Sequence, residues 1–137
     1  MATPPPTPRQ TALITGASSG IGEALAHRFA RAGFNLVLVA RSADKLAVLA
    51  ASLARDHGVK AWVAPVDLAK PDAARQLGAS MKRARRPIDV LVNNAGVLEH
   101  GRFVEMPSTR HRELIDLNVT GLSEMLAQFL PAMVARG

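Results

Sequence analysis

The sequence has 137 residues, of which 48% are hydrophobic, enough apolar side chains for the core of one domain of common size. It contains no cysteine, which excludes disulfides and thiolate metal sites and favours a cytoplasmic location. The 17 Lys and Arg residues outnumber the 11 Asp and Glu residues and give a formal net charge of +6, so a nucleic-acid partner has to be considered.

The first ten residues carry four of the nine prolines. They lack the apolar stretch of a signal peptide or a membrane span. We therefore expect residues 1–10 to be a disordered extension, residues 11–137 to form one domain, and no part of the chain to sit in a membrane. The domain opens with a short apolar strand at residues 11–15.

A glycine-rich turn follows this strand, and residues 15–22 read Thr-Gly-Ala-Ser-Ser-Gly-Ile-Gly. Gly16, Gly20 and Gly22 allow backbone conformations closed to other residues, and the amides that open the next helix can point at an anion. The spacing is not that of the general dinucleotide fingerprint, and the Lys of a P-loop is missing, which excludes a kinase or ATPase of that type. Taken alone, the segment also fits an ordinary strand-to-helix turn.

Strands and helices then alternate to the end of the chain. Further strands are expected at residues 35–40, 60–64 and 88–92. Helices are expected after the glycine run, from a cap at Ser42 to His57, over residues 71–85 and over residues 108–135. The first helix sets Ile21, Leu25 and Phe29 on one face. This α/β alternation predicts a parallel sheet with helices on both faces.

The densest basic run comprises Lys82, Arg83, Arg85 and Arg86, at the end of the third expected helix. Cations there meet the negative end of the helix dipole, which favours a solvated helix end. A nucleic-acid surface would need stacking aromatic side chains, and the chain has one Trp, no Tyr and four Phe. We therefore expect no nucleic-acid partner.

Ligands of an open parallel sheet lie beyond the carboxyl ends of its strands. The four expected strands end in the glycine run, in Ala40-Arg41-Ser42, near Asp67-Leu68, and in Asn93-Asn94-Ala95-Gly96. Together with Asn118 inside the last helix, these segments resemble the short-chain dehydrogenase/reductase family in order and separation. The resemblance covers about residues 10–137.

This resemblance implies a Rossmann-type doubly wound parallel sheet with four strands in the order 3-2-1-4, incomplete at the C-terminus. It also implies a bound nicotinamide dinucleotide. Gly16, Ser18, Gly20, Ile21 and Gly22 of the glycine run would surround the adenosine and the pyrophosphate. Residues 93–96 after the fourth strand would pass against the ribose, with Asn93, Ala95 and Gly96 at the cofactor and Asn93 also bracing the neighbouring backbone. Asp67 would accept a hydrogen bond from the adenine amino group while the backbone of Leu68 meets the ring. Asp67 also fits a turn or a helix cap, and residues 93–96 also fit a simple turn.

Arg41 bears on the choice of cofactor. NAD enzymes usually place an acid at the end of the second strand, where this chain has Ala40. The guanidinium of Arg41 can instead pair with a 2′-phosphate, supported by the hydroxyl of Ser18 or Ser42. NADP(H) is therefore expected in preference to NAD(H), although Arg41 would also suit a solvated helix entrance.

Asn118 is a mediocre helix former inside a helix and needs a reason to be there, such as solvent exposure or a backbone bond. By resemblance, it holds a local helix distortion and an ordered water of a proton relay. The family's catalytic Tyr-x-x-x-Lys pair and Ser are not matched, since the chain has no Tyr. We expect this chain to correspond to the N-terminal half of a member and to be inactive alone.

Three functions remain open at this point. The first is an NADP(H)-dependent oxidoreductase of small carbonyl or alcohol substrates, the second a noncatalytic NADP(H)-binding module, and the third a basic interaction protein. The four histidines lack zinc-ligand spacing, so no metal site is expected. Family resemblance further suggests a homo-oligomer formed through the helix at residues 108–135.

Overall fold

Four parallel strands form one sheet in this computed structural model, which describes residues 7–137. The strands are β1 (Thr11–Thr15), β2 (Asn35–Ala40), β3 (Ala61–Pro65) and β4 (Val90–Val92). They lie in the order β3-β2-β1-β4, and each neighbouring pair is parallel. The doubly wound parallel sheet and its strand order are thus confirmed.

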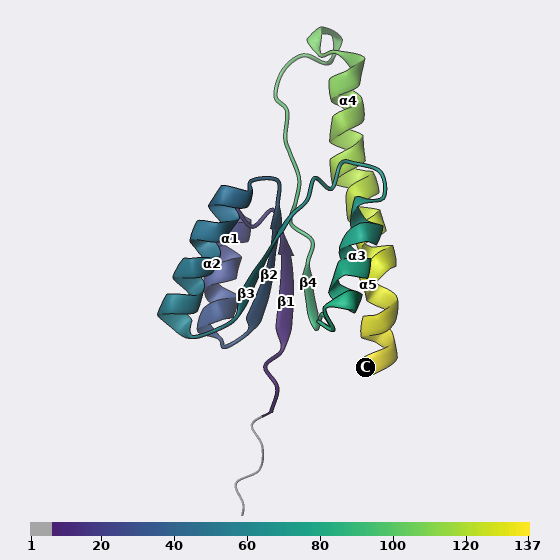
Figure 1. The fold of residues 1–137 in the computed structure, drawn as a ribbon. Helices are drawn as coiled ribbons and strands as arrows, with labels where there is room; N and C mark the ends of the chain where they lie inside the picture. Colours follow the sequence, from purple (N-terminus) through teal and green to yellow (C-terminus); the bar gives the residue numbers. More distant parts are fainter. Residues whose placement is uncertain (1–6) are drawn as a thin grey trace, which may run out of the picture.

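Helices cover both faces of this sheet (Figure 1). One face carries α1 (Gly20–Arg31) and α2 (Ala43–His57), and the other carries α3 (Ala73–Arg83) and α5 (Leu122–Arg136). A short 3₁₀ turn, η1 (Phe103–Glu105), precedes α4 (Ser108–Ile115), and α4 rises beyond the carboxyl edge of the sheet. A π-helical turn, η2 (Asp116–Gly121), joins α4 to α5.

The sheet is buried on both faces because successive residues of a strand point to opposite sides. In β1, Ala12 and Ile14 pack into the core beneath α1 and α2. Leu13, between them, packs into the core beneath α3 and α5, with Met125 and Phe129 of α5. This double burial explains why the strands read as continuous apolar runs.

The buried face of α1 differs from the face expected from the sequence. Ile21 is 72% exposed, and the buried residues are Gly22, Ala26 and Ala30. Leu25 and Phe29 pack only at the margin of that core. The prediction was wrong for Ile21 because this helix lies close to the sheet through small residues, which a search for large apolar side chains overlooks.

The ends of α2 follow the expected signals. The Ser42 hydroxyl accepts a hydrogen bond from the Lys45 amide at 3.4 Å, which caps the first turn. Gly58 ends the helix in the left-handed region with φ +66°. The helix expected over residues 108–135 is continuous, but the π-helical turn divides it into α4 and α5.

Most of the expected extension at residues 1–10 lies outside the described residues, since the description begins at Thr7. The last two residues before β1 contact the domain. The Arg9 guanidinium donates to the Gly58 carbonyl at 2.9 Å, and the Gln10 carbonyl accepts from the Asn35 amide at 2.9 Å. Among residues 7–137, no helix has both the length and the apolarity needed to span a bilayer.

Candidate cofactor site

All four predicted site segments meet at the carboxyl edge of the sheet. The parallel strands end there, so the loops after β1, β2, β3 and β4 lie along one edge (Figure 1). Two backbone bonds continue past the strand ends: the Ala17 amide donates to the Val39 carbonyl at 3.2 Å, and the Val66 amide donates to the Ala40 carbonyl at 2.9 Å. These bonds fix the glycine run and the loop after β3 relative to β2.

At two positions of the glycine run, neighbouring atoms lie so close to the backbone that only glycine fits. Gly16 has φ +65°, and a Cβ there would lie 2.8 Å from Nδ2 of Asn94. A Cβ on Gly22 would lie 2.1 Å from the Gly16 carbonyl oxygen, far inside contact distance. Gly20 differs from both, because its φ of +57° alone calls for glycine and no atom lies within 4 Å of its Cβ position.

The first turn of α1 leaves a place for an anion. Ser19 is the N-cap residue, and its side chain makes no capping bond. The first intrahelical bond runs from the Glu23 amide to the Ser19 carbonyl, and the amides of Gly20, Ile21 and Gly22 find no acceptor among residues 7–137. Three unpaired backbone amides at a helix N-terminus can bind the oxygens of a phosphate group, and no charged side chain is needed.

The structural role of Thr15 was missed by the sequence interpretation. Its hydroxyl is fully buried and accepts hydrogen bonds from the amides of Asn94, at 2.9 Å, and Ala95, at 2.8 Å. It also lies 3.4 Å from the Val92 carbonyl, to which it can donate. A hydroxyl at the end of a strand buried on both faces must find a partner, and that requirement was the available signal.

Asn94 joins the loops after β1 and β4 from the other side. Its Nδ2 donates to the Thr15 carbonyl at 3.1 Å and to the Gly16 carbonyl at 3.3 Å. The sequence interpretation placed residues 93–96 against the ribose and gave the bracing of the neighbouring backbone to Asn93. The structure instead shows Asn94 as the side chain that orients the glycine run.

Asn93 and Asn118 connect the loop after β4 to the last helices. Asn93 Nδ2 donates to the Leu122 carbonyl at 3.0 Å. Asn118, within the π-helical turn, accepts from the Val97 amide at 2.9 Å and donates to the Val97 carbonyl at 2.8 Å. The structure thus shows the local helix distortion, and the Asn118 side chain is engaged by backbone, one of the alternatives weighed from the sequence.

The loop after β3 meets the same π-helical turn. A Cβ on Gly121 would lie 2.6 Å from the Leu68 carbonyl oxygen, so glycine lets the helix approach this loop. Leu68 is 6% exposed and belongs to the core, which leaves its backbone as the part available to a ligand. Asp67 accepts from the Ala69 amide at 3.0 Å through Oδ1, a turn bond that occupies one of its two oxygens.

Arg41 and Ser42 lie after β2, as expected. Arg41 is exposed, and no carboxylate among residues 7–137 forms an ion pair with it. Ser42 uses its hydroxyl oxygen to cap α2. Ser18 lines a cavity of about 400 Å³ between α1 and α2, together with Asp44 and Lys45. Within residues 7–137, no group of three metal-ligating side chains comes together.

These features define a doubly wound α/β protein whose carboxyl edge can accept a phosphate group. The family model for the short chain dehydrogenases matches residues 10–137. The chain belongs to the short-chain dehydrogenase family.

Curated and structural relatives agree with this family. The oxidoreductase UcpA of Salmonella typhimurium is 43% identical over 129 residues, which are 93% of this chain and 48% of the relative. Serine 3-dehydrogenase of Rhizobium radiobacter is 35% identical over 92% of this chain and 49% of its own. L-Sorbose reductase of Gluconobacter frateurii, solved with NADPH and L-sorbose, has a TM-score of 0.88 at 36% identity over 94% of this chain and 49% of that chain. The chain therefore spans about half the length of the relatives that it matches.

Proposed function

We propose that this chain binds NADP(H) at the carboxyl edge of its sheet. The observation that carries the proposal is the contact between Gly22 and the Gly16 carbonyl, which sets three free amides of α1 above the end of β1. A dinucleotide pyrophosphate is the ligand that such a backbone site fits best. Relatives solved with NADPH, among them a short-chain dehydrogenase from Sphingobium yanoikuyae, support this choice.

The remaining contacts would be divided among the four loops. Ser18 and Ile21 would flank the pyrophosphate beside the three glycines. The free oxygen of Asp67 and the backbone of Leu68 would hold the adenine. Asn93, Ala95 and Gly96 would pass against the ribose, while the bonds of Asn94 to the glycine run keep that loop in place.

Arg41 would select NADP(H) over NAD(H). It is exposed and unpaired by any described carboxylate at the end of β2, where a guanidinium can meet a 2′-phosphate. Ser18 can add a hydroxyl from the neighbouring cavity wall, and Ser42 can still donate its hydroxyl proton while it caps α2.

Replacing Arg41 by Asp tests the proposal. A charge-assisted hydrogen bond is lost and a repulsive carboxylate is placed near the phosphate, so NADPH affinity should fall about 10- to 100-fold. NADH affinity should change little, because NADH lacks the 2′-phosphate. Titrations followed by nicotinamide fluorescence would measure both. Arg83→Asp makes the same charge change at the opposite edge of the sheet and should leave both affinities unchanged; equal losses for the two cofactors would refute the role of Arg41.

We further propose that the chain contributes the cofactor-binding part of an NADP(H)-dependent oxidoreductase of small carbonyl or alcohol substrates. When bound, the nicotinamide would give a hydride to a carbonyl substrate or accept one from an alcohol. Asn118 would hold an ordered water that takes part in a proton relay. This water would lie beside the loop after β4, whose Val97 backbone the Asn118 side chain binds. This sequence contains no Tyr to exchange a proton with the substrate. That absence favours the second candidate function, a noncatalytic NADP(H)-binding module, for the 137 residues by themselves.

The long helix suggests a homo-oligomer. Five large apolar side chains of this helix are 40–70% exposed, namely Ile115, Val119, Leu126, Leu130 and Val134. We propose that two copies pair through them, since an apolar stripe of this length gains from burial. Light scattering should give twice the monomer mass for the parent chain. The double variant Leu130→Glu with Val134→Glu should be monomeric, and a parent chain that is monomeric at high concentration would contradict the pairing.

A further inference from the structure

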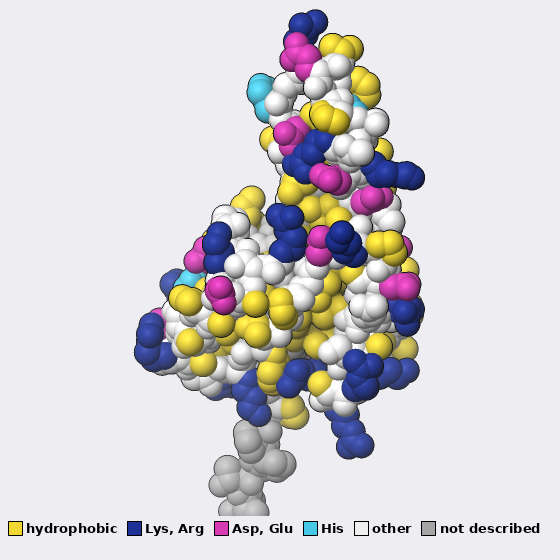
Figure 2. Space-filling view, turned by 45° about the horizontal axis from the view of Figure 1, so that its top comes forward, with side chains coloured by type: hydrophobic (Ala, Val, Ile, Leu, Met, Phe, Trp, Pro, Cys, Tyr) yellow, Lys and Arg dark blue, Asp and Glu magenta, His cyan; other side chains and the backbone are white. Residues whose placement is uncertain are grey.

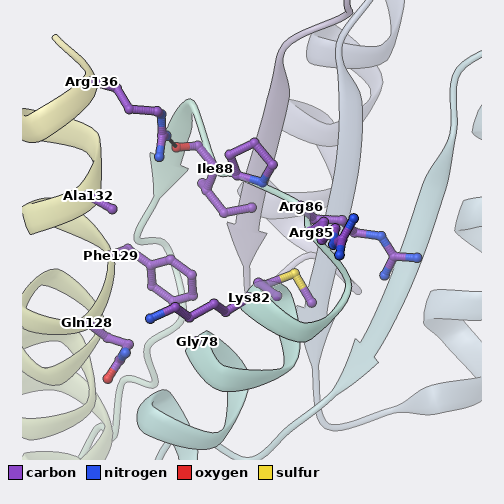
Figure 3. A pocket seen from close by; sticks show the side chains of 11 residues that line it. Gly78, Lys82, Arg85, Arg86, Ile88, Gln128, Phe129, Ala132 and Arg136 are labelled. Carbon is purple, nitrogen blue, oxygen red and sulfur yellow. Dashed lines mark hydrogen bonds between the residues drawn. The ribbon is translucent and has the colours of Figure 1, made fainter.

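A second cavity lies at the edge of the sheet opposite the cofactor site. It has a volume of about 410 Å³ and opens between the C-terminal ends of α3 and α5, beside the start of β4 (Figure 3). At the end of the cavity away from Arg136 the two helices touch, since a Cβ on Gly78 would lie 2.5 Å from the side chain of Gln128. The volume lies in the range of pockets that hold small organic ligands.

The cavity is strongly positive. Four of its lining residues are cations, Lys82, Arg85, Arg86 and Arg136, and none is an Asp or a Glu. No carboxylate among residues 7–137 forms an ion pair with any of the four. Figure 2 shows Lys and Arg side chains gathered along this lower edge of the molecule.

Two of these cations are held in place. Arg86 stacks on the ring of Trp62, with its guanidinium carbon 4.2 Å from the ring centroid. Arg136 reaches across from α5 and donates to the carbonyl of Ile88, two residues before β4 (Figure 3). An anion entering the cavity would therefore meet guanidinium groups that are partly ordered before it binds.

Helix dipoles alone do not account for this charge. The C-terminal ends of α3 and α5 each bring about half a negative charge, against four positive side chains, which leaves roughly three positive charges in excess. The carbonyls of Met81 and Lys82 at the end of α3 are already occupied by the amides of Arg86 and Arg85, at 3.0 and 3.1 Å. The positive charge of these four side chains therefore exceeds what is needed to offset the negative ends of the two helix dipoles.

Arg85 also occupies a backbone position that favours glycine. Its φ is +53°, and its amide and that of Arg86 close the end of α3 in the pattern of a Schellman motif. A side chain in this left-handed conformation costs stability relative to glycine. Strain of this kind persists only where the surrounding structure holds it, and it is found most often at functional sites.

The wall of the cavity is apolar. Met81, Ile88 and Phe129 line it between the cations, and Phe129 points into it from α5. We propose that this cavity binds a small amphiphilic anion, whose carboxylate or phosphate head is held by the cations of the lining, Lys82 and Arg85 among them, and whose short apolar body lies against Phe129. The site is separate from the cofactor edge and does not depend on NADP(H) binding.

Octanoate and octyl phosphate, titrated into the 137-residue chain and followed by calorimetry, test the proposal. Both should bind, and the methyl resonances of Met81 and Ala132 should shift while those of the glycine run stay in place. Octylammonium, which has the same tail and the opposite charge, should not bind. Binding of octylammonium as tight as that of octanoate, or binding of inorganic phosphate as tight as that of octyl phosphate, would overturn the proposal.

Variants locate the head group. Lys82→Gln should weaken octanoate binding about tenfold, the loss expected for one charge-assisted hydrogen bond. Arg83→Gln removes the same charge one residue away, outside the cavity lining, and should change the affinity by less than about twofold. An equal loss in the two variants would show a general charge effect and reject the site.

Arg85→Gly separates binding from folding. It relieves the left-handed strain, so the thermal midpoint should rise, and it removes a cation, so octanoate binding should weaken. A variant that is more stable and binds less cannot be explained by partial unfolding. Unchanged octanoate affinity in Arg85→Gly would contradict the assignment of Arg85.

Discussion

Replacing Gly22 by Ala should destabilise the domain by about 3 kcal/mol, at the upper end of the cost of overpacking, and should abolish NADP(H) binding. The added Cβ would lie 2.1 Å from the Gly16 carbonyl oxygen, a backbone atom that no side-chain rotation can move away. Either α1 or the glycine run must shift, and the three free amides then lose their common orientation. Urea unfolding and an NADPH titration would measure the two effects.

Gly20 provides the matched control in the same turn. No atom lies within 4 Å of its Cβ position, and only its φ of +57° restricts substitution. Asn tolerates this left-handed conformation, so Gly20→Asn should cost no more than about 1 kcal/mol. If Gly20→Asn destabilised the chain as much as Gly22→Ala, the close approach of α1 to the glycine run would not be the reason for Gly22.

Thr15→Val should cost about 3 kcal/mol, because the part-buried amides of Asn94 and Ala95 lose the Thr15 hydroxyl as their acceptor. Val keeps the shape and the strand preference of Thr, so packing changes little. With a typical domain stable by roughly 5–15 kcal/mol, the loss is a large share of the total. The midpoint and slope of a urea unfolding curve give the measurement.

Thr15→Ser separates the hydroxyl from the methyl group. It keeps the acceptor for both amides and removes one buried methyl, so it should cost only about 1 kcal/mol. The loop after β4 should also keep its amide protection in Thr15→Ser and lose it in Thr15→Val. Similar losses of stability in the two variants would show that the hydroxyl is not what holds this loop.

The order of elements could be read from the sequence because it depends on local signals. Apolar runs gave the strands, and the cap at Ser42 and the glycine at Gly58 marked the ends of α2. Parallel pairing follows from the alternation of strands and helices, so the site segments were also expected at one edge. Arg41 and Asp67 could be placed at the strand ends in this way.

Contacts between distant segments could not be read from the sequence. The exposure of Ile21 follows from how closely α1 approaches the sheet, which depends on Ala26 and Ala30 meeting the sheet rather than on the spacing of large side chains. The bonds of Thr15 to residues 79 and 80 positions later need the sheet order and the loop path. The π-helical turn at Asn118 likewise depends on the Val97 backbone, 21 residues earlier.

The three asparagines at the carboxyl edge have a consequence for local unfolding. Asn94 ties the loop after β4 to the glycine run, Asn93 ties it to the start of α5, and Asn118 ties it to the π-helical turn. Opening of the loop after β4 breaks the bonds to all three segments at once. The edge should therefore fluctuate as one cooperative unit, in which ordering of the glycine run by a phosphate also lowers the opening rate of a helix that the phosphate does not touch.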